Sequence, residues 1–321
     1  MRYRRLGKSA LQVSELCLGT MNFGPRTSAE DSFEILNEAV TNGINFIDTA
    51  NQYGGELGVG ATETILGKWL TEDTTRRDRL ILATKVHEPM SDDVNDRGLS
   101  ARHIQAACDA SLKRLGVDHI DLYQMHHIDR AAPVEEIWQA MERLIVQGKV
   151  TYVGTSNFPG WAIAQTSEKA LAKHQLGLVS EQGLYNLVER RAEMEVLPAC
   201  RAYGLGLIPW SPLAGGLLAG QSSTETGRRQ SDQMKHAAQD RANQLAQFET
   251  LSQSLGEAPS NVALAWLLHQ EGVVSTIIGP GSKQQLTSVM SVPELQLEKA
   301  VLTKLDEIFP PCGPSPEAYA W

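Results

Sequence analysis

Residues 80–126, LILATKVHEPMSDDVNDRGLSARHIQAACDASLKRLGVDHIDLYQMH, contain the pattern that decides the fold. The short apolar runs at 80–83 and 120–123 predict two strands, because both are compact and contain β-branched or aromatic residues. Between the two runs, Ser100 predicts the start of a helix and Gly116 predicts its end. A strand, a helix and a second strand in this order are typical of a parallel sheet. The apolar face of the helix is formed by Ile104, Cys108 and Leu112.

The same alternation of strand and helix extends along the whole chain. Further helices are predicted from Ser28 to Gly43, from Pro133 to Gly148, and after Ser260. Eight strands that alternate with helices predict an α/β fold, a single (β/α)₈ TIM barrel domain over residues 1–321, with a doubly wound open sheet as the structural alternative. The eight predicted strands contain residues 16–18, 44–47, 80–83, 120–123, 151–154, 178–180, 205–208 and 274–278.

Three segments outside this alternation carry their own predictions. The N-terminal residues form two short strands around a turn at Gly7, Lys8 and Ser9, and we expect this β-hairpin to close the floor of the barrel. The polar stretch 221–247 makes the connection after the seventh strand unusually long, so it is predicted to be a mobile loop that covers the site. A second polar loop, residues 87–99, follows the third strand and is a candidate substrate contact.

Composition excludes several classes of protein. The chain has 321 residues, of which 42% are hydrophobic, and a formal net charge of −9, which indicates a globular protein without nucleic acid as its main partner. Its four cysteines include no CxxC pair, which argues against a disulfide framework or a thiolate zinc site. The N-terminus lacks an apolar signal region and no run approaches 18 apolar residues. We therefore expect a cytoplasmic protein that does not bind membranes.

Polar residues follow the predicted strands at the positions where barrel enzymes carry their chemistry. Each of them alone also fits a turn cap or a solvated side chain, so only their joint placement indicates a site. The second strand leads to Asp48 and Tyr53, the third to Lys85, and the fourth to His126. The others are Gln124, Ser156, Asn157, Gln182, Trp210 and Ser211.

Four of these residues form a proton-donating site for a carbonyl group. A phenol is a poor acid near neutral pH, but an ammonium such as Lys85 lowers the pKa of a neighbouring phenol such as Tyr53. Asp48 would keep Lys85 protonated and oriented, and His126 would donate a hydrogen bond to the substrate oxygen. No side chain can supply a hydride, so a cofactor must bind beside these four residues.

The sequence resembles the aldo-keto reductases, and the resemblance covers nearly the whole chain. Seven motifs occur in the order that the family shows, which is far more specific than a single glycine pattern. They are GTMNFG (19–24), NFIDTANQYG (45–54), LATK (82–85), DLYQMH (121–126), GKVTYVGTSNF (148–158), YNL (185–187) and IPWSPLAGGLL (208–218).

The resemblance implies carbonyl reduction with a nicotinamide cofactor and a small carbonyl compound as the partner. It makes Tyr53 the general acid, supported by Asp48, Lys85 and His126. It also implies that three polar side chains hold the nicotinamide carboxamide, that Trp210 stacks on the nicotinamide ring, and that residues 211–216 approach the pyrophosphate. The implied cofactor-binding residues are Gly19, Thr20, Met21, Asp48, Ser156, Asn157, Gln182, Trp210, Ser211, Pro212, Leu213, Gly215, Gly279, Gly281, Lys283 and Gln285.

The stretch after the last strand departs from the family pattern for binding the 2′-phosphate of NADPH. Gly281 stands where the family often has Arg, and Ser288 and Val289 stand where an acidic residue and Asn are expected. Lys283 is the one cation of that stretch, although Arg228 and Arg229 in the long polar connection could compensate. The resemblance still favours NADPH, with NADH or dual use as the alternative.

Smaller motifs indicate a branch of the family. GLSARHI at 98–104, HHIDRAAP at 126–133 and the pair Gly160 and Trp161 are similar to bacterial reductases of deoxysugar pathways, which act on nucleotide-linked keto- or enoyl-hexoses. Reductases of general aldehydes share much of the same framework.

Two other function classes remain open at this stage. One is a nicotinamide-binding sensor or channel-associated subunit with little turnover. The other is a metal-dependent hydrolase, suggested by His126, His127 and Asp129. Strand alternation would point His126 and His127 to opposite faces, which argues against a shared ion and makes His127 a packing or loop residue. The sequence gives no prediction of the oligomeric state.

Overall fold

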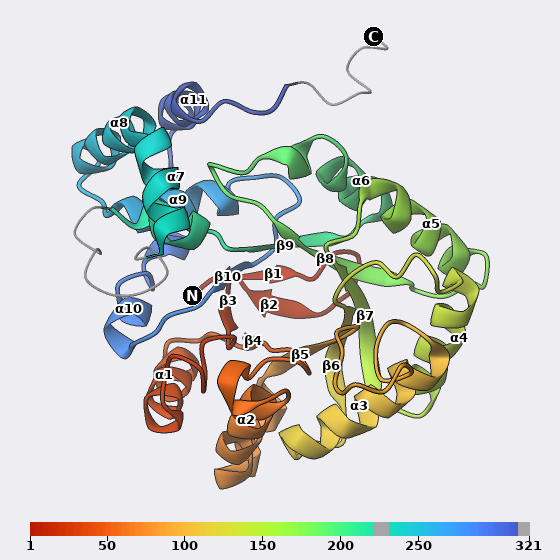
Figure 1. The fold of residues 1–321 in the computed structure, drawn as a ribbon. Helices are drawn as coiled ribbons and strands as arrows, with labels where there is room; N and C mark the ends of the chain where they lie inside the picture. Colours follow the sequence, from red (N-terminus) through yellow and green to blue (C-terminus); the bar gives the residue numbers. More distant parts are fainter. Residues whose placement is uncertain (221–230, 314–321) are drawn as a thin grey trace.

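A barrel of eight parallel strands forms the centre of the molecule, and helices surround it (Figure 1). The computed structural model describes residues 1–220 and 231–313. The strand order is β10-β3-β4-β5-β6-β7-β8-β9, and the backbone of Leu207 in β9 bonds both Gly272 and Val274 just before β10, which closes the barrel. The strands are β3 (Leu16–Gly19), β4 (Phe46–Asp48), β5 (Ile81–Val86), β6 (Ile120–Met125), β7 (Val150–Ser156), β8 (Leu178–Leu184), β9 (Gly206–Trp210) and β10 (Thr276–Ile278). All eight predicted strands and the barrel fold are confirmed.

Helix boundaries follow the predicted caps. The side chain of Ser28 accepts a hydrogen bond from the backbone of Asp31, and that of Ser100 accepts one from His103. Pro133 immediately precedes its helix instead of lying in the first turn. The α-helices are α1 (Ala29–Thr41), α2 (Ala61–Glu72), α3 (Ala101–Leu115), α4 (Val134–Val146), α5 (Gly160–Leu171), α6 (Val196–Tyr203), α7 (Asp232–Asp240), α8 (Ala242–Ser254), α9 (Pro259–Leu268), α10 (Lys283–Thr287) and α11 (Lys299–Ile308). Short 3₁₀ turns are η1 (Gly55–Leu57), η2 (Thr74–Arg79), η3 (Arg191–Glu193), η4 (Ala214–Ala219) and η7 (Val292–Glu294).

An antiparallel hairpin of β1 (Tyr3–Arg5) and β2 (Gln12–Ser14) closes the floor of the barrel, as predicted. Its turn lies so close to the barrel that a Cβ atom on Gly7 would come within 2.2 Å of the carbonyl oxygen of Val179. The backbone N–H of Lys8 donates to the carbonyl oxygen of Gly204 at 2.6 Å. Leu6 and Val13 are fully buried among the side chains that point into the barrel, so the hairpin packs as part of the core.

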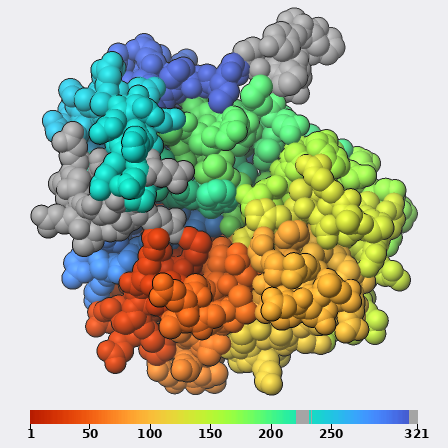
Figure 2. All heavy atoms as spheres, in the orientation of Figure 1, coloured from red at the N-terminus to blue at the C-terminus, as the bar shows by residue number. Residues whose placement is uncertain are grey.

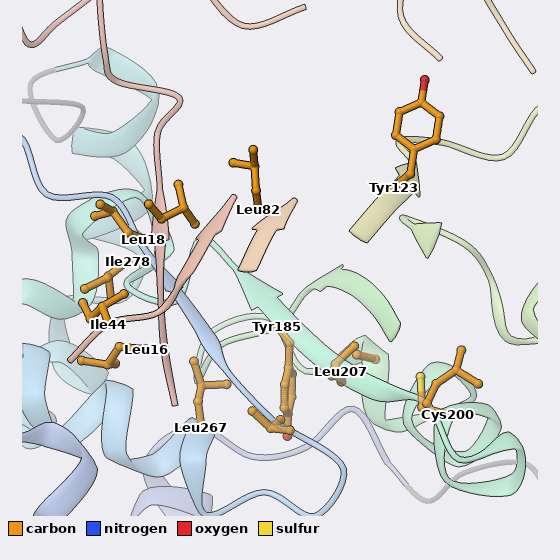
Figure 3. Packing of buried hydrophobic residues seen from close by; sticks show 14 of the residues in the cluster. Leu16, Leu18, Ile44, Leu82, Tyr123, Tyr185, Cys200, Leu207, Leu267 and Ile278 are labelled. Carbon is orange, nitrogen blue, oxygen red and sulfur yellow. The ribbon is translucent and has the colours of Figure 1, made fainter. Parts of the chain in front are cut away.

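Alternation along the strands divides the core into two parts. One side of each strand packs in the outer core, where Leu82 on β5 and Tyr123 on β6 lie (Figure 3) and where Tyr123 Oη donates to the carbonyl oxygen of Ile104 on α3. The residues that alternate with these point into the barrel. There Ala83 and Leu122 pack in one cluster with Leu6 and Val13 of the hairpin. The same inward side continues upward to Lys85, and this alternation carries a charged side chain into the mouth of the barrel.

A β-bulge between β7 and β8 changes which residues of β8 face inward. Val153 pairs with Leu178, but its neighbour Gly154 pairs with Ser180, so Val179 is an extra residue in the ladder. Leu178 packs in the outer core, and strict alternation would have placed Gln182 outside as well. The bulge instead brings Gln182 into the barrel mouth.

From residue 231 onward, the polar stretch after β9 is helical and is not the loop that the sequence predicts. Its first ten residues, 221–230, lie outside the described residues, and residues 231–247 contain α7 and the first half of α8. Gln244 in α8 donates to the carbonyl oxygen of Ile308 in α11, and Phe248 packs on Phe309. Figure 2 shows α7 and α8 in cyan at the surface, close to α11 in blue. The polar composition of the segment does not indicate these helices, because their exposed faces are almost entirely polar.

Within the described ranges, none of the helices combines the length and the hydropathy that crossing a bilayer requires.

Candidate active site

Asp48, Lys85 and Tyr53 meet at the mouth of the barrel. Lys85 Nζ lies 2.5 Å from Asp48 Oδ2, 3.2 Å from Tyr53 Oη and 3.0 Å from the carbonyl oxygen of Thr49. The lysine side chain is fully buried. The strand ends of β4 and β5 and the loop after β4 therefore bring together three of the four residues that the sequence predicts for proton donation.

The second oxygen of Asp48 accepts hydrogen bonds from two glutamines. Gln124 Nε2 on β6 and Gln182 Nε2 on β8 each donate to Asp48 Oδ1 at 2.9 Å. Gln182 also donates to Gln124 Oε1 at 3.1 Å, so the carboxylate anchors a small buried network. Gln124 was noticed at the strand end but given no role in the site. Its alternation with Leu122, which lies two residues earlier on β6, is the signal that places it inside.

The electrostatics keep Lys85 charged. Burial lowers the pKa of its ammonium, but the charges of Asp48 and Tyr53 raise it by more, and the net pKa lies above the ordinary value. The ammonium is therefore protonated at neutral pH and faces the Tyr53 oxygen. A positive charge at this place stabilises negative charge on that oxygen.

His126 completes the group of four. Its ring stands edge-to-face against Tyr53, with centroids 5.9 Å apart and planes at 77°. Burial lowers the pKa of His126 to about 2, with further contributions from the charge of Lys85 and from His127 and His87. The imidazole is therefore neutral at physiological pH, and it offers a hydrogen bond without competing with Tyr53 as an acid.

We expect the ring of His126 to show no titration between pH 4 and pH 9, because its pKa lies far below that range. The measurement is a pH series of ¹⁵N-edited NMR spectra of the histidine rings, with the His126 signal assigned by its loss in His126→Gln. A titration of that signal with a midpoint near pH 6.5 would show that the ring is more solvated than its 8% exposure indicates.

Three predicted carboxamide ligands and Trp210 form one connected group. Trp210 Nε1 donates to Asn157 Oδ1 at 2.9 Å, and Asn157 Nδ2 donates to Ser156 Oγ and to the carbonyl oxygen of His126. Asn157 has a φ of +58°, a left-handed conformation that Asn tolerates better than most residues. Asn157 thereby links the indole of Trp210 to the backbone of His126. Ser156 Oγ in turn donates to the backbone oxygen of Gln182.

The turn after β9 has an unusual backbone. Ser211, Ala214, Gly215 and Gly216 all have positive φ values, between 48° and 102°. Positive φ is costly for Ser and Ala, and such strain persists where a functional loop needs it. Asn186, a residue to which the sequence analysis gave no role, holds this turn by donating from Nδ2 to the carbonyl oxygen of Ser211 at 3.0 Å.

Glu181 is a second residue that the sequence analysis missed. It lies on the outward side of β8, is fully buried, and accepts a hydrogen bond from the backbone N–H of Phe158 at 3.0 Å. Burial raises the pKa of its carboxyl to about 8, although hydrogen bonds from Thr155 and the backbone of 157–158 partly offset that effect. Its other oxygen has no partner in the described structure, which fits a protonated carboxyl. Through its bond to the Phe158 N–H, Glu181 stabilises the backbone next to Asn157, whose φ is positive.

At the end of β3 lie Gly19, Thr20 and Met21. Thr20 donates from both its backbone and its hydroxyl to the carbonyl oxygen of Asp48 at 3.0 Å, which joins this loop to the site. Met21 is 44% exposed at the rim. These positions border the residues that the sequence predicts for catalysis.

The predicted phosphate-binding stretch after β10 holds its cation away from the turn. Gln285 Oε1 accepts from the backbone N–H of Gly281 at 2.7 Å, and Gly279 is held through its carbonyl oxygen by Asn22. Lys283 Nζ lies 2.7 Å from Glu38 Oε2 on α1, and this hydrogen bond raises the lysine pKa. Lys283 is therefore already paired. The arginines at 228 and 229 lie outside the described residues.

The predicted orientation of His126 and His127 is wrong. The two side chains do not point to opposite faces, because their rings stack with centroids 5.1 Å apart and planes at 17°. Both residues lie beyond Met125, where β6 ends, so strand alternation no longer applies. Among the described residues, no group of three or more His, Cys, Asp or Glu is arranged to hold a metal ion.

The donor set fits a nicotinamide dinucleotide. A carboxamide carries two N–H donors, and the side-chain oxygens of Ser156, Asn157 and Gln182 are acceptors that their own internal hydrogen bonds hold in place. An anchored indole offers a flat face for a ring, and the glycines of the strained turn leave room for a close approach by phosphate.

Comparison with known proteins agrees with this geometry. The profile of the aldo/keto reductase family matches residues 15–309. The chain is 49% identical to the uncharacterized oxidoreductase YrpG of Bacillus subtilis, over 100% of both chains. It is 32% identical to versiconal hemiacetal acetate reductase of Aspergillus parasiticus, covering 97% of this chain and 98% of that one. It is also 32% identical to a probable voltage-gated potassium channel subunit beta of Arabidopsis thaliana, covering 99% and 100%. The chain therefore belongs to the aldo/keto reductase family of NAD(P)H-dependent oxidoreductases.

Proposed function

We propose that this protein reduces the carbonyl group of an aldehyde or ketone to an alcohol with NADPH, and that Tyr53 is the general acid. The observation that carries the proposal is the position of Lys85 Nζ, between Asp48 Oδ2 at 2.5 Å and Tyr53 Oη at 3.2 Å. A buried ammonium next to a phenol oxygen stabilises the phenolate that remains after the proton has moved. His126 donates a hydrogen bond that orients the substrate oxygen toward Tyr53.

A bound nicotinamide supplies the hydride in this proposal. Ser156, Asn157 and Gln182 hold its carboxamide, and Trp210 covers one face of the ring, so that the other face meets the substrate. The remaining contacts come from the backbone of the turn at 211–216 and from the stretch after β10.

NADPH is proposed as the preferred cofactor, with NADH accepted as well. The pairing of Lys283 with Glu38 and the glycine at 281 leave little positive charge for a 2′-phosphate among the described residues of that stretch. A weak preference between the two cofactors follows from this arrangement.

We propose a sugar-derived or nucleotide-linked keto- or enoyl-hexose as the substrate. The support is an aromatic side chain at the rim: Trp161 is 50% exposed, and the guanidinium of Arg130 lies 5.9 Å from the centre of its ring. An exposed indole packs against the apolar face of a sugar ring, and a guanidinium binds phosphate oxygens well. We place the reaction in the cytoplasm, because all four cysteines are free thiols, which suits a reducing compartment.

The alternative is a nicotinamide-binding sensor or regulatory subunit with little turnover. It is favoured by the similarity to potassium channel β subunits of Arabidopsis thaliana and Schizosaccharomyces pombe. The complete set of Asp48, Tyr53, Lys85 and His126 favours catalysis instead. Tight nicotinamide binding without reduction of any carbonyl, together with a co-purifying partner protein, would support the sensor.

The test follows the hydride directly. NADPH and NADH that carry two deuterium atoms at C4 of the nicotinamide are incubated separately with the protein and 4-nitrobenzaldehyde. We expect deuterium on the alcohol carbon of the product, detected by mass spectrometry, with both cofactors and with rates that differ by less than about tenfold, since less than about 1.4 kcal/mol then separates them. Product without deuterium, or no product from any carbonyl in a broad panel, would refute hydride transfer.

A further inference from the structure

A cluster of three polar side chains lies beside the catalytic histidine and has no part in the proposed mechanism. This rim cluster consists of His87, Glu88 and His127. Glu88 Oε1 lies 3.3 Å from His87 Nδ1 and 3.4 Å from His127 Nε2, and the two imidazole rings meet edge-to-face at 5.6 Å. His87 and Glu88 follow β5 directly, just beyond Lys85, and His127 follows β6. The cluster is therefore built on the same two neighbouring strand ends as the active site.

The cluster is in direct contact with the site. The ring of His127 stacks on that of His126, which itself faces Tyr53. His127 is 45% exposed, while the side chains of His87 and Glu88 are each about one-quarter exposed. A substrate whose carbonyl oxygen reaches Tyr53 and His126 would place the atoms next to that carbonyl near the exposed edge of the cluster.

The carboxylate of Glu88 determines which atoms of the rim cluster can accept a hydrogen bond from a ligand. One oxygen of Glu88 faces a nitrogen of each ring, so protons are favoured on His87 Nδ1 and His127 Nε2. Burial and the neighbouring His87 lower the pKa of His127, in spite of Glu88, so its ring is neutral at pH 7. The opposite nitrogen of the neutral His127 ring, Nδ1, is then a hydrogen-bond acceptor, as is the second oxygen of Glu88. In the part of the chain that the structure describes, His127 Nδ1 has no hydrogen-bond partner.

A neutral ring nitrogen and a negatively charged carboxylate select for hydrogen-bond donors. Hydroxyl groups match these acceptors, a bare hydrocarbon leaves them unpaired, and a carboxylate or phosphate is repelled by Glu88. Arg130, which could bind phosphate, packs against Trp161 instead.

We propose that the rim cluster binds hydroxyl groups on the carbon atoms next to the reacting carbonyl, and that the enzyme therefore selects hydroxylated aldehydes and ketones. This inference rests on the proposed function. It assigns His87, Glu88 and His127 to substrate specificity and leaves the proton transfer to Tyr53.

The experiment compares matched substrates and matched variants. Values of kcat/KM are measured for glyceraldehyde and propanal, and for erythrose and butanal, with 4-nitrobenzaldehyde as a substrate without hydroxyl groups. The variants are Glu88→Gln, which removes the charge, and His127→Phe, which keeps a stacking ring and removes the acceptor. The control is Glu142→Gln, which alters an exposed carboxylate on α4 that pairs with Lys173. Circular dichroism and thermal unfolding verify that each variant is folded.

We expect the wild-type protein to prefer each hydroxylated substrate by at least about tenfold, since hydrogen bonds to a charged group are stronger than those between neutral groups. Glu88→Gln and His127→Phe should each reduce that preference several-fold, mainly through KM, and leave 4-nitrobenzaldehyde reduction unchanged. Glu142→Gln should keep the wild-type preference.

Two results would overturn the inference. A wild-type preference near one, or a preference that both rim variants retain, contradicts it while 4-nitrobenzaldehyde is still reduced. If no carbonyl is reduced at all, the proposed function itself fails, and the inference fails with it.

Discussion

Tyr53→Phe is expected to lower kcat by about three orders of magnitude, because a positioned general acid contributes about 10²- to 10⁴-fold to a reaction rate. The substitution removes a single oxygen atom. Lys85 keeps its bonds to Asp48 at 2.5 Å and to the carbonyl oxygen of Thr49 at 3.0 Å, so the buried ammonium remains paired. The loss should therefore fall on the chemical step and leave cofactor binding and folding as they are.

The measurements are kcat with 4-nitrobenzaldehyde, the Kd of NADPH from quenching of tryptophan fluorescence, and Tm. The matched control is Tyr203→Phe, which removes a hydroxyl that bonds Glu168 on the surface of the molecule. Tyr203→Phe should behave like the wild-type protein in all three measurements. Full turnover by Tyr53→Phe would remove this tyrosine from the mechanism, whereas a tenfold weaker Kd would show that its role is in binding.

Glu181→Gln is expected to stabilise the protein at alkaline pH. Burial raises the pKa of the Glu181 carboxyl to about 8, whereas an unfolded chain has the ordinary value near 4.3. Between these two pH values the folded protein binds the additional proton, so its free energy of unfolding falls as the pH rises. The fall amounts to roughly 5 kcal/mol at about 1.4 kcal/mol per pH unit, and it is complete above pH 8. Glutamine is neutral throughout and still accepts from the Phe158 N–H.

Urea unfolding of both proteins at pH 5 and pH 9 measures this effect. The advantage of Glu181→Gln should be small at pH 5 and should approach about 5 kcal/mol at pH 9. Glu142→Gln, in which the carboxylate is exposed, should follow the wild-type pH dependence. An equal effect of Glu181→Gln at both pH values would mean that Glu181 is already ionised when it is buried.

The fold was largely predictable because its signals are local. Apolar runs and helix caps such as Ser100 act within a few residues, and eight repeats of one unit leave few ways to arrange them. The polar segment after β9 was misjudged because α7 and α8 bury little of their surface. Their helical structure depends on distant contacts such as that between Phe248 and Phe309, and a local pattern contains no information about them.

The sequence predicts which residues form the candidate site better than it predicts the contacts between them. The motifs placed Asp48, Tyr53 and Lys85 at strand ends, where the barrel brings them together. Gln182 reaches the site through a bulge at Val179, which shifts the register by one residue and which no periodicity indicates. The stacking of His126 on His127 arises beyond the end of β6, where alternation stops being a guide. Roles of this kind depend on backbone irregularities that only the assembled fold displays.

The hairpin at the barrel floor also determines the order in which the molecule can be completed. Its residues are synthesised well before their partners: Lys8 bonds Gly204, and Arg4 bonds the carbonyl oxygens of Leu268 and Val273. The partners of Arg4 follow it by 264 and 269 residues, so the hairpin cannot dock until most of the barrel has been made. Until then Leu6 and Val13 remain without their buried surroundings. The hairpin is thus among the last parts of the fold to reach its native contacts.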